Sequence, residues 1–218
     1  MGVTLHYRGT LDHPDRLPAL CDELAEVAQA MGWSAVRIDD DYDAPLDARL
    51  NHDSSGARID GNVGLKGIVL TPDDGSESLW FCFDREGQLR SLLGQILILD
   101  GTLKPEESWA FTKTQFSSPE RHVWIVGLLR YVQKNYVSDL EVRDEGGYWD
   151  TGDLAELRRR MNLIHGMIAD MTTALSAPRF AHLAGQSAED VVAAIERLAQ
   201  ELHRPSADAN PSDNPDRR

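Results

Sequence analysis

Apolar residues recur at two spacings in the first part of the chain, and these spacings predict two strands and a helix. In residues 3–10 the first three odd positions carry Val, Leu and Tyr, which is typical of a strand with one buried face. Asp12 and Pro14 then favour a helix start, and Gly32 favours its end. Between them, apolar residues step by three and four along one helix face: Leu17, Cys21, Leu24, Val27, Ala28 and Met31. Residues 33–38 have the composition of a second strand.

Residues 39–64 interrupt this pattern and predict a long acidic connection. The segment carries seven aspartates against two arginines, together with Pro45 and three glycines. We expect a loop with a short helical turn at residues 46–50. Long loops inside compact domains are usually functional or mobile, so this segment is a candidate site.

The next part of the chain predicts an antiparallel meander of three or four strands. The turn sequence Pro72-Asp73-Asp74-Gly75 separates its first two members. Gly94 interrupts the third member, which predicts one bent strand or two short ones. The apolar or alternating segments are residues 65–71, 79–83, 89–99 and 108–116.

A second helix and a further strand follow the meander. Ser117-Ser118-Pro119-Glu120 combines a serine cap, an early proline and a first-turn acid, which predicts a helix start. The helix extends to about residue 135 and is apolar on most sides, so we expect it to be largely buried. Residues 138–143 then form a strand, and the strand–helix–strand order favours a parallel pair.

The last third of the chain predicts a pair of helices. Asp153 and Glu156 form a capping pair at the start of the first helix. Residues 187–202 carry a second apolar stripe, so the helical pair spans residues 153–204, whereas residues 205–218 lack apolar positions and should be disordered. The first helix has a seam at heptad spacing: Leu154, Leu157, Met161, Ile164, Ile168, Met171 and Leu175.

Together these elements predict an α+β fold in a single domain of residues 1–204. We expect a mostly antiparallel sheet of about six strands, packed by the first helix and by the helix of residues 118–135. The C-terminal pair of helices lies beside this sheet. The stretch between Asp144 and Asp153 joins the sheet to the helical pair and contains two adjacent aromatics, Tyr148 and Trp149.

Charge narrows the classes of partner. The chain has 36 acidic and 22 basic residues, for a net charge of -14. Such a charge opposes binding to nucleic acid, whose phosphates are contacted by clustered Lys and Arg, and it disfavours anionic membranes. A basic protein partner fits the charge better.

Cysteine use predicts a reducing cytoplasm as the compartment, and we expect a bacterial-type cytosolic protein. Cys21 and Cys82 both lie in apolar patterns, as small core residues do, and form no disulfide framework. The longest apolar run covers roughly residues 123–129, far short of the ~20 residues that a membrane span needs.

Metal and cofactor motifs are weak, and we expect neither. Asp39, Asp41 and Asp43 have the spacing of the first ligands of a calcium loop, but Ala44 replaces the glycine and Leu50 replaces the glutamate that such loops require. The seven histidines lie singly, without metal-ligand spacing. Nucleotide-binding glycine motifs are also missing from the sequence.

Four polar side chains remain as a catalytic set: Lys113, His122, Asp150 and Asp153. Asp150 and Asp153 have the chemistry of an acid and base pair or of metal ligands, but Asp153 equally fits a helix cap. His122 lies near the start of a buried helix, where a hydrogen-bonded structural histidine is the simpler interpretation. Lys113 fits an ordinary exposed strand position.

The leading hypothesis is a non-enzymatic protein that acts through protein–protein contacts, in the manner of an immunity protein, an antitoxin or a regulator. Its expected binding residues are Tyr148, Trp149, Asp39, Asp40, Asp41 and Asp43. One alternative is a carboxylate-based, metal-assisted hydrolase that uses the catalytic set above. Another is a structural subunit that forms homodimers through the seam of residues 154–175.

Overall fold

A computed structural model describes residues 3–53, 56–72 and 75–175 of the chain. Residues up to Ile164 form one compact unit, and a second unit begins at His165. The helix predicted for residues 187–202 and the tail predicted for residues 205–218 lie outside the described residues, so the single domain of residues 1–204 stays a prediction.

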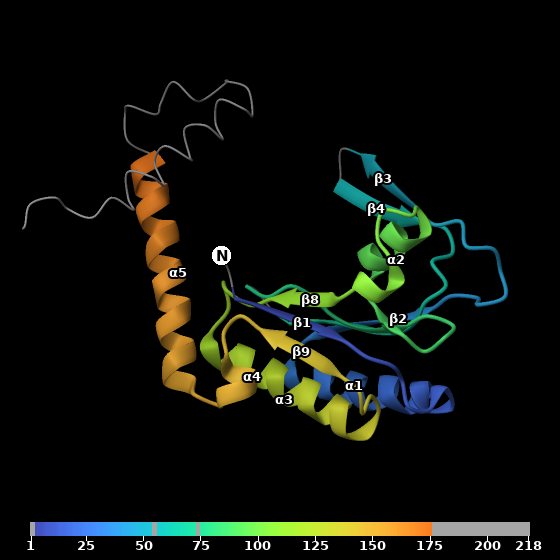
Figure 1. The fold of residues 1–218 in the computed structure, drawn as a ribbon, viewed down its shortest axis with the longest axis horizontal. Helices are drawn as coiled ribbons and strands as arrows, with labels where there is room; N and C mark the ends of the chain where they lie inside the picture. The colour runs from blue at the N-terminus through green and yellow to red at the C-terminus, as the bar shows by residue number, and fades with distance from the viewer. Residues whose placement is uncertain (1–2, 54–55, 73–74, 176–218) are drawn as a thin grey trace, which may run out of the picture. The chain divides into compact units, whose positions relative to one another are not determined.

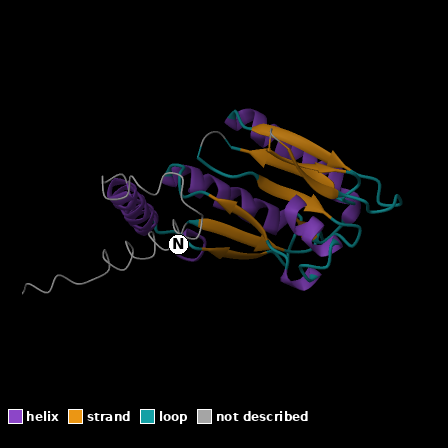
Figure 2. Ribbon diagram, turned by 90° about the horizontal axis from the view of Figure 1, so that it is seen from above, coloured by secondary structure: helices purple, strands orange, loops and turns teal. Residues whose placement is uncertain are grey.

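The described part of the chain contains nine strands, rather than the six predicted: β1 (Thr4–Arg8), β2 (Ser34–Asp39), β3 (Arg49–Asp53), β4 (Gly56–Asp60), β5 (Lys66–Thr71), β6 (Leu79–Phe83), β7 (Leu89–Arg90), β8 (Ala110–Lys113) and β9 (Glu141–Asp144). A three-stranded sheet has the order β8-β1-β9 and a four-stranded sheet the order β2-β5-β6-β7, while β3 and β4 form a separate hairpin (Figure 2). Every pairing among these strands is antiparallel. The α+β class with a mostly antiparallel sheet is therefore confirmed.

The two larger sheets meet just beyond the end of β1. The Leu89 N–H donates to the Gly9 carbonyl at 2.9 Å, and the Leu11 N–H donates to the Gly87 carbonyl at 2.8 Å. The strands of both sheets therefore form one layer (Figure 1).

The prediction of a parallel pair is wrong in one respect, because the two strands are not neighbours in the sheet. Strands β8 and β9 both pair antiparallel with β1, so they run in the same direction, but β1 lies between them. The intervening helix does cross over the sheet, as the strand–helix–strand order indicated.

The helices are α1 (Leu17–Met31), α2 (Leu92–Leu99), α3 (Pro119–Asn135), α4 (Tyr148–Thr151) and α5 (Leu154–Leu175), with short 3-10 helices at Pro14–Arg16 and Pro105–Glu107. Gly32 ends α1 in the left-handed conformation, with a φ of 69°. The Ser118 hydroxyl accepts a hydrogen bond from the Arg121 N–H and so caps α3. Both boundaries follow the expected signals.

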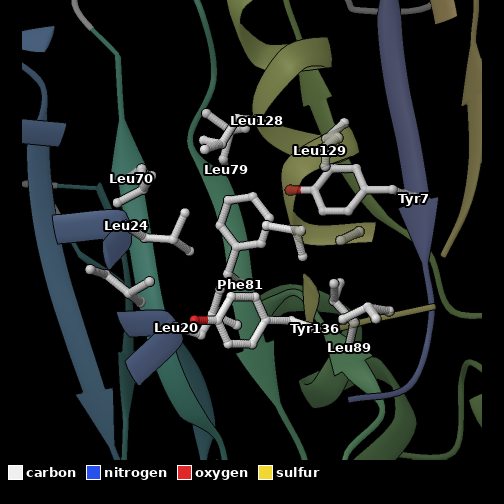
Figure 3. Close-up of a cluster of buried hydrophobic side chains, with 14 of the residues drawn as sticks. Tyr7, Leu20, Leu24, Leu70, Leu79, Phe81, Leu89, Leu128, Leu129 and Tyr136 are labelled. Carbon is white, nitrogen blue, oxygen red and sulfur yellow. The ribbon is translucent and has the colours of Figure 1, made fainter. Parts of the chain in front are cut away.

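The main core lies where α1 and α3 cover one face of the strand layer (Figure 1). Burial of this apolar surface contributes roughly 25 cal/mol for each square ångström removed from water. Figure 3 shows side chains from both helices and from the strands gathered in this core: Tyr7, Leu20, Leu24, Leu70, Leu79, Phe81, Leu89, Leu128, Leu129 and Tyr136.

Tyr7 joins the two sheets inside the core. Its hydroxyl accepts a hydrogen bond from the Trp80 N–H at 2.8 Å and lies 3.4 Å from the Thr112 hydroxyl. Burial raises the pKa of Tyr7 to about 12, because the charged form would lose its hydration.

A smaller core covers the other face of the four-stranded sheet. Cys82 of β6 and Ile96 of α2 are buried in it together with Val63, Leu65 and Val69. Ile59 of the β3–β4 hairpin packs against the same cluster. Both cysteines are buried and free, as expected for core residues, and burial raises the pKa of the Cys82 thiol to about 12.

Two predicted elements are wrong. Residues 89–99 form the short strand β7 followed by α2, whose start is capped by the Ser91 hydroxyl accepting from the Gly94 N–H. A short apolar run does not distinguish a strand from a buried helix by periodicity alone. Residues 46–50 form no helical turn, because Arg49 and Leu50 begin a hairpin in which Leu50 lies opposite Ile59.

The start of α5 belongs to the first unit. Leu157 and Met161 of the predicted seam are buried against Val3, with Leu154 and Ile164 partly buried beside them. This half of the seam is therefore occupied within the chain. Among the described residues, no helix is long and apolar enough to cross a membrane.

Candidate functional site

The turn between β9 and α5 is held on the body of the protein by its two aromatic side chains. Gly147 and Gly152, with φ values of 76° and 65°, border the single turn α4. Tyr148 and Trp149 are partly buried and pack against the main core. Arg130 of α3 donates a hydrogen bond to the Trp149 carbonyl at 2.6 Å. The turn therefore fixes the end of the sheet against α3.

A buried series of hydrogen-bonded polar side chains reaches this turn. Thr114 Oγ1 is 2.8 Å from His122 Nδ1, and His122 Nε2 is 3.1 Å from Asp144 Oδ2. Asp144 also accepts hydrogen bonds from the N–H groups of Gly146 (2.7 Å) and Trp149 (2.8 Å). These contacts join the end of β8, α3 and β9 with the turn.

These three side chains have the hydroxyl–imidazole–carboxylate order of a catalytic triad, but they lie inside the protein core. The Thr114, His122 and Asp144 side chains have no exposed surface. A carboxylate only accepts hydrogen bonds, so Nε2 carries a proton and donates it to Asp144. The Thr114 hydroxyl also donates to the Val3 carbonyl at 3.2 Å. His122 is thus the hydrogen-bonded structural histidine that the sequence favoured.

Opposing effects set the ionisation of Asp144. Burial raises the pKa of its carboxyl, but the hydrogen bonds from His122, Trp149 and Gly146 outweigh burial and leave that pKa below its ordinary value. The carboxylate therefore stays charged and paired at neutral pH.

Asp153 caps α5, as predicted. Its Oδ1 accepts from the N–H groups of Ala155 (2.9 Å) and Glu156 (3.0 Å). The reciprocal contact of a capping box is not made, because the Glu156 carboxylate binds Arg159 and Arg160, which lower its pKa to about 2.

Replacing Asp153 by alanine should lower the free energy of unfolding by about 1 kcal/mol, because two N–H groups at the helix start lose their acceptor. Urea denaturation followed by circular dichroism measures this change. Asp153→Asn keeps an acceptor oxygen and should stay close to the unmodified protein. Equal losses in the two variants would contradict a capping role.

The structure does not bring the predicted catalytic set together. His122 is buried and Asp153 caps α5, whereas Asp150 is exposed on α4. The Lys113 ammonium lies at the end of β8, 5.9 Å from the centre of the Phe116 ring. Gln115, two residues further along the chain, is buried. The four side chains therefore share no common point at which a substrate would sit.

Two of the four predicted acidic binding residues form ion pairs within the chain. Asp39 contacts the Lys66 ammonium at 2.9 Å, and Asp43 contacts the Arg85 guanidinium at 2.5 Å. Hydrogen bonding to Asp39 raises the pKa of Lys66. Much of the charge at this end of the segment is thus already compensated.

The other two acidic residues shape the backbone. Asp40 Oδ2 accepts from the N–H groups of Val63 (3.1 Å) and Leu65 (3.3 Å), and so holds the two ends of the acidic segment together. Asp41 Oδ1 accepts from the Asp43 N–H at 2.9 Å, as in an Asx turn. The carboxylates of Asp40 and Asp41 therefore accept hydrogen bonds from nearby backbone N–H groups.

A large apolar hollow lies elsewhere, between α1 and α3. We call it the α1–α3 groove; its volume is about 800 Å³. Trp124 in its wall has 59% of its surface exposed, and Tyr131 has 41%. Its lining residues are Glu23, Glu26, Val27, Ala30, Met31, Trp33, Val123, Trp124, Gly127, Leu128 and Tyr131.

Helical geometry explains the groove. On α3 the buried stripe includes Ile125, Leu129 and Val132, which face the core. Trp124 and Tyr131 lie two turns apart on another face of the same helix, where Gly127 leaves space between them. The expectation that α3 is largely buried is therefore wrong on this side.

Acidic groups border the groove. Glu26 is exposed, and the Tyr131 hydroxyl donates a hydrogen bond to Glu23. That bond raises the pKa of Tyr131 to about 12 and lowers the pKa of Glu23. The Glu23 carboxylate therefore stays charged at neutral pH beside an apolar floor.

No group of three or more His, Cys, Asp or Glu side chains in the described part of the chain is arranged to hold a metal ion. Comparison with models of known protein families, with curated proteins and with solved structures finds no match. The α1–α3 groove is the candidate functional site because it combines size, apolar character and exposed aromatic rings.

Proposed function

We propose that this protein is non-enzymatic and acts by binding a partner protein through the α1–α3 groove. The partner presents a basic amphipathic helix, with apolar residues on one face and Lys or Arg beside them. The role is that of an immunity protein, an antitoxin or a regulator. The observation that carries the proposal is the exposed Trp124 in an apolar groove of this size.

Exposed aromatic rings support a binding role. Large contiguous apolar patches on soluble proteins usually mark interaction sites, and Trp and Tyr are enriched among the residues that dominate binding energies. Gly127 keeps the groove open between Trp124 and Tyr131. Amphipathic helices bind such grooves through apolar anchors at positions i, i+3, i+4 and i+7.

Charge supports the choice of a basic partner. Glu23 and Glu26 are the charged residues among those that line the groove, and the chain as a whole carries -14. Opposite charges at the edge of an apolar contact accelerate association and select the partner. We place the partner here rather than on Asp39 and Asp43, because those carboxylates are paired with Lys66 and Arg85.

A synthetic amphipathic helix of leucine and lysine tests the groove directly. We expect it to bind the full-length protein and to change its tryptophan fluorescence. Trp124→Ala should weaken this binding at least about tenfold, since truncating a central aromatic anchor typically costs ~2 kcal/mol or more. Isothermal titration calorimetry gives the affinities.

The matched control is Phe116→Ala, because Phe116 has the same exposed fraction of 59% but does not line the groove. This variant should bind like the unmodified protein. A peptide of the same composition with leucines scattered around the helix should bind weakly. If Trp124→Ala binds as tightly as Phe116→Ala, the groove is not the binding site.

A further inference from the structure

The exposed edge of the four-stranded sheet offers a second, independent surface. Strand β2 is the terminal strand of this sheet and pairs along its whole length with β5. Five of its six residues are exposed and Ile38 is partly buried. Val36 is 57% exposed even though its strand partner Val69 is buried. No described residue therefore covers this edge.

The hydrogen-bond pattern shows which backbone groups are open. The Asp40 N–H donates to the Leu65 carbonyl at 3.1 Å, so this pair of residues is a hydrogen-bonded pair of the ladder. Hydrogen-bonded pairs recur at every second residue, so Ser34, Val36 and Ile38 also direct their backbone groups towards β5. The N–H and C=O groups of Ala35, Arg37 and Asp39 consequently point away from the sheet.

The usual devices that block an edge are weak here. Proteins protect edge strands with proline, bulges or charged side chains. Strand β2 contains neither proline nor glycine, and its register with β5 is unbroken. Its two charges are compensated within the chain, because Arg37 binds Asp22 and Asp39 binds Lys66.

We propose that a second copy of this chain pairs with this edge, antiparallel and about a two-fold axis at Val36. In this register Val36 lies opposite Val36 of the second copy, and Ser34 lies opposite Ile38. Each Ala35 lies opposite an Arg37, and the outward backbone groups of these residues bond to each other. An isologous contact of this kind is closed and gives a dimer.

Charge and the length of strand overlap together favour this register over its neighbours. An axis at Arg37 would place two guanidinium groups directly opposite each other, which is destabilising. An axis at Ile38 would place Arg37 opposite Asp39, but only residues 37–39 of the strand would then overlap, and the exposed Val36 would lie opposite Asp40. The axis at Val36 avoids like charges and removes two exposed valines from water.

Ala35→Pro tests the pairing because it removes an outward N–H and leaves the bonds to β5 intact. Proline is tolerated on the open side of an edge strand. The full-length protein should have twice the mass of one chain at 100 μM in light scattering coupled to size exclusion, whereas Ala35→Pro should be monomeric with an unchanged circular dichroism spectrum. The matched control Ala35→Ser keeps the N–H and should remain dimeric.

Val36→Lys serves as a second variant if Ala35→Pro fails to fold. It keeps the Val36 N–H that faces β5 and places two ammonium groups together on the axis, so it should also be monomeric. A monomeric unmodified protein at 100 μM would overturn the proposal. A dimer that survives in the folded edge variants would overturn it too, and would point to another surface such as the predicted C-terminal helices.

Discussion

Replacing Asp144 by alanine is expected to lower the free energy of unfolding by about 3–5 kcal/mol, because three hydrogen-bond donors lose their acceptor and each unsatisfied buried group costs ~1–3 kcal/mol. His122 would lose its partner at Nε2, and the N–H groups of Gly146 and Trp149 would lose their acceptor. Urea denaturation at neutral pH measures the loss. Asp150→Ala is the matched control, because Asp150 is an exposed aspartate in the same turn, and it should change the value by less than ~0.5 kcal/mol.

The same carboxylate should give a pH signature. Its pKa in the folded protein is lowered from the ordinary value of 3.8, so its stabilising contribution is present above that value and is lost as the pH falls through the lowered pKa. Stability of the unmodified protein should therefore fall more steeply below about pH 4 than stability of Asp144→Asn. Identical slopes in the two proteins would contradict the assigned hydrogen bonds.

Gly67→Ala is expected to lower the free energy of unfolding as much as Asp144→Ala does, for a steric reason. A Cβ atom at Gly67 would lie 2.1 Å from the Phe81 carbonyl oxygen and 2.7 Å from the Cys82 Cα, and both are backbone atoms. The φ of 150° at Gly67 is also one that other residues rarely adopt. Strain and overpacking together should cost about 3–5 kcal/mol, measured as lost soluble yield and a lower urea midpoint.

Gly127→Ala is the opposite control for this substitution. A Cβ at Gly127 meets no atom within 4 Å, and alanine is favoured over glycine inside a helix by about 0.8–1.0 kcal/mol. This variant should therefore be slightly more stable than the unmodified protein. A loss of stability at Gly127 equal to that at Gly67 would show that neither effect depends on the local space.

The elements that sequence predicts well are those whose spacing and capping are local. The α1 stripe, its end at Gly32 and the Ser118 start of α3 are all decided within a few residues. Strand β1 alternates in the same local way. In contrast, α2 is too short and too uniformly apolar for its period to be read, and its helical state depends on packing against the sheet.

The candidate sites depend on contacts between residues far apart in the chain, which local sequence patterns do not predict. The sequence predicts a hydrogen-bonded His122, but its partners Thr114 and Asp144 are eight and 22 residues away and belong to other elements. The sequence does not predict the α1–α3 groove, because the apolar pattern of a helix does not show which of its sides stays uncovered. A useful signal was present in Trp124 and Tyr131, which repeat after seven residues on a face distinct from that of Ile125 and Val132.

The central position of β1 in its sheet has a consequence for how the protein is made. Both neighbours of β1 are supplied by residues more than 100 positions later in the chain, with Leu5 opposite Thr112 on one side and Asp144 on the other. During synthesis the backbone groups on both edges of β1 therefore stay unpaired until β8 and β9 have left the ribosome. Such distant pairing slows folding and exposes a sticky segment to other chains, so newly made protein should depend on chaperones until β9 closes the sheet.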